Sequence, residues 1–127
     1  MGSLNGRTDA MEILTSDQLM DQKCKPCQGG VPAYSVALSQ QQLENLPGWE
    51  LSEDQKSIFK SYTFSNFLQG LDFCNRVGTI AEQEQHHPDL HLTGYKHVRV
   101  ELMTHDIGGL SANDFILAAK INGVENA

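Results

Sequence analysis

The chain has 127 residues, a length that fits one domain with a single modest core. Sixteen Asp and Glu against nine Lys and Arg give a net charge of −7, and no basic segment offsets it, so direct nucleic-acid binding is not expected. No apolar run approaches the ~20 residues that cross a bilayer. We therefore expect a cytoplasmic protein without membrane contact, although an organellar transit peptide removed beforehand would leave no trace in this sequence.

Residues 1–36 are expected to form a flexible leader. One helical turn is predicted within it, because Thr15 and Gln18 have capping-box spacing and Leu14 and Leu19 can form the accompanying apolar staple. The leader also carries a Cys-x-Pro-Cys-x-Gly-Gly segment that begins at Cys24. Such a cysteine pair is half of a zinc site or a redox motif, but no second pair is present, so a structural or incidental role is favoured.

The folded domain is expected over residues 37–127. It opens with a short helix that starts at Ser39 and is closed by Pro47-Gly48. A β-hairpin follows, formed by residues 49–51 and 56–64, since apolar side chains alternate in the second segment. Trp49 is interpreted as a core or edge anchor, with a place in a pocket wall as the alternative.

The middle of the chain predicts a long helix and a second hairpin. The helix starts at the N-cap Ser65 and ends before Pro88, and its predicted buried stripe is Phe67, Leu71, Cys74, Gly78 and Ala81. In the hairpin we expect Leu90 opposite Val98, which would place His91 opposite His97 on the solvent face. His105 is expected at the end of the second strand.

A final helix is predicted from Ser111, with a buried stripe of Ala112, Phe115, Leu117, Ala119 and Ile121. The resulting α-ββ-α-ββ-α order predicts an α+β fold with a four-stranded antiparallel sheet and helices packed on one face. Because the open face and edges of the sheet need cover, we expect an oligomer.

All five histidines lie between residues 82 and 114. Imidazole gives and takes protons near neutral pH, so the cluster predicts acid–base chemistry or a metal site. Glu82 precedes His86 by one helical turn and is expected to pair with it. A metal held by His86, His87, His91 and His105 is the alternative, which is disfavoured because neighbouring residues in extended chain point to opposite sides.

The spacing of Glu82, His86-His87-Pro88, Tyr95, His105 and Asp114 resembles the signature of the pterin-4a-carbinolamine dehydratases, and the similarity extends from about residue 38 to residue 121. The resemblance implies a subunit of a homodimer or homotetramer that dehydrates 4a-hydroxytetrahydropterins to quinonoid dihydropterins. Such enzymes recycle the tetrahydrobiopterin cofactor of aromatic amino acid hydroxylases, and the reaction requires no metal or organic cofactor.

The resemblance implies that His86, His87 and His105 are catalytic, with Glu82 and Asp114 as associated carboxylates. We hypothesise that His86 and His105 exchange protons with the substrate and that His87 positions it, while the carboxylates hold the imidazole tautomers. Asp114 also has capping-box spacing from Ser111. Further substrate contacts are predicted for Thr104 and, secondarily, for Trp49.

Two other functions compete with this one. The first is a non-catalytic binding or assembly module on the same fold, since relatives act as a transcriptional dimerisation cofactor or as assembly factors. The second is a zinc protein that uses Cys24, Cys27 and histidines. The chain also departs from the pattern of the family that it resembles. Asn113 occupies a position where the animal pterin-4a-carbinolamine dehydratases have a basic residue.

Overall fold

A computed structural model of the chain describes residues 13–26 and 32–125, so Cys27, Gly29 and Gly30 of the cysteine segment lie outside the described residues. The elements, in chain order, are α1 (Ser16–Met20), α2 (Val36–Leu43), β2 (Glu50–Leu51), β3 (Ile58–Thr63), α3 (Phe67–Glu84), β4 (Asp89–Thr93), β5 (His97–Leu102), the 3-10 helix η2 (His105–Ile107) and α4 (Ala112–Glu125). The predicted α+β fold is confirmed.

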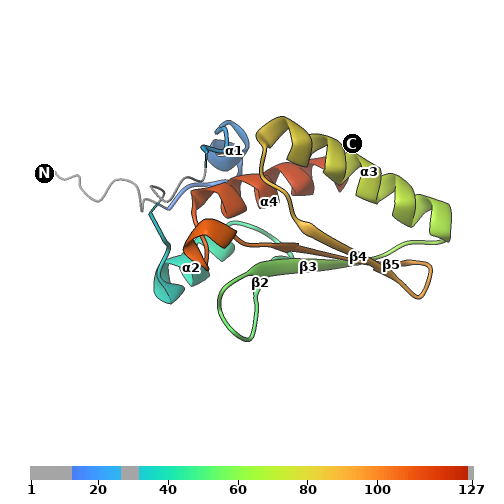
Figure 1. The fold of residues 1–127 in the computed structure, drawn as a ribbon, viewed down its shortest axis with the longest axis horizontal. Helices are drawn as coiled ribbons and strands as arrows, with labels where there is room; N and C mark the ends of the chain where they lie inside the picture. The colour runs from blue at the N-terminus through green and yellow to red at the C-terminus, as the bar shows by residue number, and fades with distance from the viewer. Residues whose placement is uncertain (1–12, 27–31, 126–127) are drawn as a thin grey trace, which may run out of the picture.

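The four strands form one antiparallel sheet in the order β2-β3-β5-β4. Each predicted hairpin supplies two neighbouring strands, and β3 joins them by pairing with β5 along its whole length, from Ile58 opposite Leu102 to Thr63 opposite His97. Figure 1 shows α3 and α4 lying across the same side of this sheet. The predicted packing of helices on one face is confirmed.

The predicted register of the second hairpin is wrong by two residues. Leu90 lies opposite Val100, and His91 lies opposite Arg99. The turn is centred on Tyr95, which adopts a left-handed φ of 56° after Gly94 at 54°. Because the shift is even, the apolar side chains keep their predicted face, and both His91 and His97 remain exposed on the other face as expected.

The α3 helix buries a face that shares only Ala81 with the predicted stripe. Its N-cap is Asn66, one residue after the expected Ser65, and the Asn66 side chain accepts a hydrogen bond from the Gln69 N–H. The buried positions are Gly70, Phe73, Val77, Ala81 and Glu84. Phe67 and Leu68 instead remain 48% and 74% exposed. The helix start therefore carries an exposed apolar patch.

The α4 helix is buried on nearly every side. Phe115, Leu117, Ala118, Ala119 and Ile121 are all fully buried. A helix that is buried on most sides must have neighbours on more than one side, and α4 packs against both α3 and α1 (Figure 1). Leu19 of α1 is fully buried in the same core.

Part of the expected leader is packed on the domain. The predicted capping box of Thr15 and Gln18 is present at the start of α1. Just before it, the Gln42 side chain accepts from the Leu14 N–H at 2.9 Å and donates to the Leu14 carbonyl at 2.7 Å. The expected domain boundary near residue 36 stays a prediction, but α1 shares one core with the rest of the folded domain.

The α2 helix begins earlier than the sequence indicates. Ser35 is its N-cap and accepts from the Leu38 N–H, whereas the predicted cap Ser39 lies buried inside the helix. Ser39 and Gln42 have the spacing of a capping box, which predicts a helix start at Ser39. The Gln42 side chain instead hydrogen-bonds the Leu14 backbone, so the capping box does not form.

We expect Leu19→Ala to lower the free energy of unfolding by about 2–5 kcal/mol, because the truncation opens a cavity between α1 and α4. Urea denaturation monitored by circular dichroism measures this loss. Asp17→Ala is the matched control on the exposed side of α1, with an expected cost below about 1 kcal/mol. A Leu19→Ala variant as stable as the control would contradict the place of α1 in the core.

Candidate active site

The exit from α3 separates the two adjacent histidines. Gln85 caps the helix in the left-handed conformation, with φ 55° and ψ 38°, and its N–H donates to the Ala81 and Glu82 carbonyls. The chain therefore turns before His86, whose N–H still reaches the Ala81 carbonyl at 3.2 Å. As a result His86 is buried, with 7% of its surface exposed, whereas His87 is exposed.

His86 is held by the fully buried carboxylate of Asp114. Its Nε2 lies 2.7 Å from Asp114 Oδ1. The second carboxylate oxygen accepts from the Thr104 hydroxyl at 2.8 Å and from the Ser111 N–H at 3.0 Å. The carboxylate is thus surrounded by donors, which assigns the imidazole proton to Nε2 and leaves Nδ1 as the nitrogen that can accept a proton.

Asp114 serves two structures at once. Through Ser111 it caps the N-terminus of α4, the spacing that the sequence predicts. Through His86 it connects this helix start to the exit of α3. The orientation of His86 consequently depends on how the ends of two helices meet.

His87, and not His86, is the partner of Glu82. The Nε2 of His87 lies 2.7 Å from Glu82 Oε1, and both side chains are mostly exposed. The predicted Glu82–His86 pair is therefore wrong. Its physical reason is the left-handed Gln85, which interrupts the helical spacing that a pair four residues apart requires.

His105 reaches the site from a 3-10 turn. The β5 strand ends at Leu102, and His105 begins η2, so the predicted strand end lies three residues before it. Thr104 anchors the turn by pairing with Gly109. The His105 side chain is exposed and forms no hydrogen bond with any residue in the described ranges.

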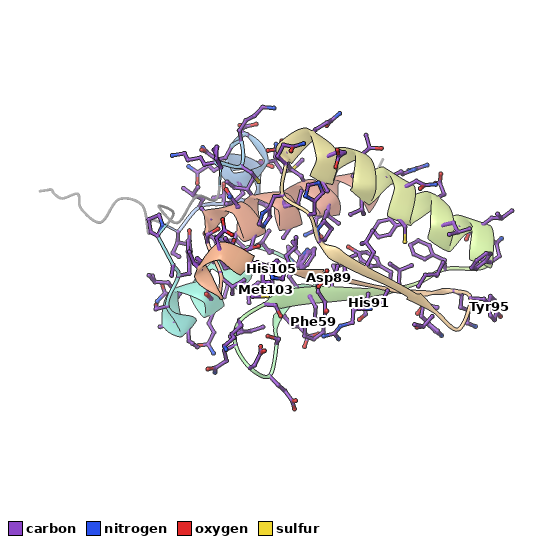
Figure 2. All side chains as sticks on the ribbon, viewed as in Figure 1. Phe59, Asp89, His91, Tyr95, Met103 and His105 are labelled. Carbon is purple, nitrogen blue, oxygen red and sulfur yellow. The ribbon has the colours of Figure 1, made fainter. Side chains whose placement is uncertain are left out.

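The three predicted histidines line one hollow of about 200 Å³, together with Gln85, Met103, Thr104 and Asp106. A smaller hollow of about 70 Å³ adjoins it and shares His87, Met103 and His105. Figure 2 shows Met103 and His105 at one end of the sheet, with Tyr95 at the far tip of the hairpin. Three imidazole side chains, two from the exit of α3 and one from η2, therefore converge on a single space.

Several lining residues are not among the predicted site residues. Met103 lies between the two hollows, and Ser57, Asp89 and Glu101 line the smaller one. Met103 and Glu101 could have been predicted from strand alternation, because residues 101, 103 and 105 are spaced by two and an extended strand points them to the same face as His105. Sequence alone contains no comparable signal for Ser57, which arrives from the other hairpin.

The two predicted substrate contacts differ in position. Thr104 lines the hollow, although its hydroxyl is already bonded to Asp114 and Ser111. Trp49 is 4% exposed, its indole N–H donates to Asn122, and it lines neither hollow. The burial of Trp49 agrees with its interpretation as a core anchor. Nothing in its position supports the predicted contact with substrate.

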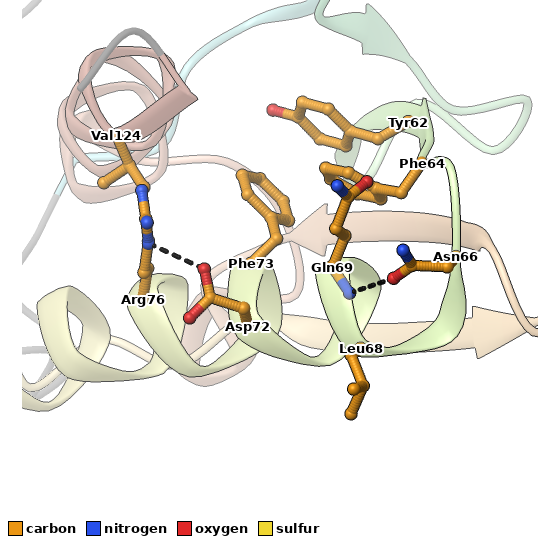
Figure 3. A pocket seen from close by; sticks show the side chains of 9 residues that line it. All are labelled: Tyr62, Phe64, Asn66, Leu68, Gln69, Asp72, Phe73, Arg76 and Val124. Carbon is orange, nitrogen blue, oxygen red and sulfur yellow. Dashed lines mark hydrogen bonds and ion pairs between the residues drawn. The ribbon is translucent and has the colours of Figure 1, made fainter.

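Another hollow, of about 470 Å³, lies beside the first half of α3 (Figure 3). Aromatic rings of Tyr62, Phe64 and Phe73 form its wall, and an Asp72–Arg76 ion pair of 3.0 Å lies at its rim. His86 follows the opposite end of this helix, which is about 27 Å long at 1.5 Å per residue. No histidine lines this hollow, so we do not assign the acid–base site to it.

Metal-ligand clusters and membrane-spanning helices are both absent from the described part of the chain. No group of three His, Cys, Asp or Glu side chains within it is arranged to hold a metal ion. Nor is any helix in these ranges both long enough and apolar enough to cross a membrane.

The chain belongs to the pterin 4 alpha carbinolamine dehydratase family, whose sequence pattern matches residues 32–124. A family relative from Halorhodospira halophila is 45% identical over 106 residues, which are 84% of this chain and 96% of the relative. The pterin-4-alpha-carbinolamine dehydratase 2, mitochondrial, of Arabidopsis thaliana is 46% identical over 127 residues, or 98% of this chain and 66% of that protein.

Solved structures agree with the fold. A transcriptional coactivator/pterin dehydratase from Brucella melitensis superposes with a TM-score of 0.68 at 27% identity, covering 73% of this chain and 98% of the other. A pterin dehydratase-like protein described as a RuBisCO assembly factor in the alpha-carboxysome has a TM-score of 0.52 at 17% identity and covers 63% of this chain. This second similarity concerns the fold alone.

Proposed function

We propose that this chain dehydrates 4a-hydroxytetrahydropterins to quinonoid dihydropterins by histidine acid–base catalysis. The observation that carries the proposal is the convergence of His86, His87 and His105 on one hollow. The reaction breaks the C4a–O bond and the N–H bond of the adjacent ring nitrogen, so a C=N bond forms and water leaves. One group must protonate the hydroxyl and another must accept the nitrogen proton.

His86 and His105 are proposed for these two proton transfers. The carboxylate of Asp114 accepts a hydrogen bond from Nε2 of His86, so the lone pair of the neutral ring is on Nδ1, which suits His86 to act as the base. His105 is exposed and can exchange protons with water, which suits it to act as the acid and to be reset after each turnover. Each transfer typically contributes about 10²- to 10⁴-fold to a rate.

His87 is proposed to position the pterin. It lines both hollows, so it can contact a flat molecule that extends from one into the other. Glu82 fixes its ring by accepting from Nε2 at 2.7 Å, and the remaining ring nitrogen can contact the substrate. Met103 lies in the same shared wall and offers an apolar surface for a ring.

We expect Glu82→Gln to raise KM about 3- to 10-fold with little change in kcat, because the variant weakens a charge-assisted hydrogen bond that orients a binding residue. Steady-state kinetics measure the two constants separately. Glu44→Gln is a matched control at the exposed C-cap of α2 and should leave both unchanged. A Glu82→Gln variant with lowered kcat and unchanged KM would contradict the assignment of His87 to binding.

The competing function is a non-catalytic binding or assembly module. Stopped-flow dehydration of a synthetic 4a-hydroxytetrahydropterin, with a stable dihydropterin as competitor, distinguishes the two. Catalysis predicts an accelerated absorbance change that the dihydropterin suppresses competitively. A chain that leaves the spontaneous rate unchanged would overturn the proposed dehydration and favour the module.

We propose a homodimer or homotetramer. The β4 strand is a sheet edge, and backbone groups on its outer side are open to pairing with a second copy. The exposed Phe67 and Leu68 supply an apolar patch at the start of α3. Light scattering coupled to gel filtration should give a multiple of the 14.1 kDa chain mass, and a mass of one chain would contradict this expectation.

The role in the cell follows from the reaction. A quinonoid dihydropterin is a form that a reductase can return to the tetrahydro state, so we place the chain in recycling the cofactor of aromatic amino acid hydroxylases. A cytoplasmic location remains our expectation. One relative is named mitochondrial, so a fluorescent fusion to the chain's C-terminus is the direct test of location.

A further inference from the structure

The segment of residues 23–26, which we call the strap, runs over the place where the exit of α3 meets the start of α4. The Lys25 N–H donates to Asn113 Oδ1 at 2.9 Å, and Asn113 Nδ2 donates to the Lys25 carbonyl at 2.7 Å. This pair of bonds uses both polar atoms of a side chain that is only 2% exposed. The strap is thus joined to the first turn of α4.

A second anchor joins the strap to the last turn of α3. The Cys24 N–H donates to Glu84 Oε1 at 2.8 Å. The other Glu84 oxygen accepts from the Lys120 ammonium of α4 at 3.1 Å. Burial raises the pKa of Glu84, but the hydrogen bonds from Cys24 and Lys120 outweigh burial and lower it overall. Glu84 therefore links strap, α3 and α4 as a buried charged group.

These anchors are close in sequence to the hydrogen-bonded pair of His86 and Asp114. Asn113 immediately precedes Asp114, and Glu84 is two residues before His86. The strap spans the two helix ends whose separation sets the 2.7 Å distance between His86 Nε2 and Asp114 Oδ1. Catalytic geometry is sensitive on this scale, since a displacement of about 1 Å can cost on the order of 10²-fold in rate.

We propose that the strap holds His86 and Asp114 in register, with Asn113 and Glu84 as positioning residues that act through this pair. The proposal rests on the proposed dehydration for its effect on rate, but its structural part concerns the His86–Asp114 hydrogen bond alone. It assigns a role to the N-terminal segment, which lies outside the residues matched by the family pattern.

The thiol of Cys24 reports whether the strap is in place. Burial and then the charge of Glu84 raise its pKa from an ordinary 9.0 to about 12. Release of the strap would return the thiol toward its ordinary pKa and raise its thiolate fraction near pH 8 by up to about 10³-fold. Alkylation by iodoacetamide in a Cys27→Ser background, mapped by mass spectrometry, measures this change.

The test compares Asn113→Ala and Glu84→Ala with Glu84→Gln, which keeps an acceptor oxygen for the Cys24 N–H. We expect both alanine variants to alkylate faster at Cys24 and to lose about 10- to 100-fold in kcat at nearly constant KM. The NMR signal of the His86 Nε2 proton should shift or broaden in both. Glu84→Gln should lie closer to wild type in kcat and in the His86 signal. Its loss of the Glu84 charge speeds Cys24 alkylation by itself, so the alkylation readout is judged on Asn113→Ala.

Two controls separate positioning from general loss of stability. Ile58→Val removes a buried methyl group from the sheet and should lower stability without moving the His86 signal. Gln22→Ala alters an exposed side chain just before the strap and should change nothing. Faster Cys24 alkylation in Asn113→Ala with an unchanged His86 signal would overturn the proposal. A wild-type protein without turnover would refute the proposed dehydration instead. The His86 Nε2 proton signals of the variants would still show whether the strap positions His86.

Discussion

His86→Ala and His105→Ala are each expected to reduce kcat for dehydration of a 4a-hydroxytetrahydropterin by about 10²- to 10⁴-fold, because each removes one of the two proposed proton-transfer groups. The double variant should lose less than the product of the single losses, since groups that act in one step are not additive. Stopped-flow absorbance under single-turnover conditions measures all three rates.

The chain contains its own matched control for this comparison. His97 is also exposed and also lies in the histidine-rich region, but its Nδ1 contacts Thr63 and it lines neither hollow around the site. His97→Ala should retain the wild-type kcat. If His97→Ala and His105→Ala were equally active, the assignment of His105 to proton transfer would be wrong.

Asp114→Ala is expected to lower the free energy of unfolding by about 3–5 kcal/mol, because it leaves partners of a buried charge without an acceptor. Those partners are His86, Thr104 and the Ser111 N–H. Denaturant unfolding of purified protein measures the loss. A variant within about 1 kcal/mol of wild type would contradict the central place of Asp114 in this network.

Asp114→Asn separates stability from tautomer control. The amide preserves the shape of the side chain, so it should lose less stability than alanine. Its NH₂ group can face His86 Nε2, however, which would move the imidazole proton to Nδ1 and remove the base. A reversed tautomer costs serine proteases about 10⁴-fold in kcat, and a loss of similar direction is expected here. Full activity of Asp114→Asn would contradict the proposed role of the carboxylate.

The overall fold could be predicted because each element carries its own periodic signal. Alternating residues define β3 and β5, and helical spacing with clear end signals defines α3 and α4. The α2 start was harder, because Ser35 and Ser39 both have cap chemistry and the burial of Ser39 depends on tertiary packing. Local sequence could not decide between them.

Register and helix orientation required information from distant parts of the chain. A two-residue slip between β4 and β5 preserves every side-chain face, so the apolar pattern could not distinguish Leu90 opposite Val98 from Leu90 opposite Val100. Apolar residues also occupy two neighbouring faces of α3. Contact with the sheet and α4 selects the face of Phe73 and Val77 and leaves Leu68 exposed.

The grouping of His86, His87 and His105 could be predicted from their spacing, but their partners could not. The choice of Glu82 between His86 and His87 depends on one left-handed residue, Gln85, which carries no strong sequence signal for that conformation. Asp114 was predicted as a cap and as an orienter, and the structure places both contacts on the same carboxylate.

The most direct test of the central claim is the stopped-flow rate of 4a-hydroxytetrahydropterin dehydration by the wild-type chain, measured against His86→Ala/His105→Ala at equal concentration. We predict a concentration-dependent acceleration above the spontaneous rate for wild type, and a rate indistinguishable from buffer for the double variant. Equal rates for the two proteins would contradict the claim that these histidines perform the reaction.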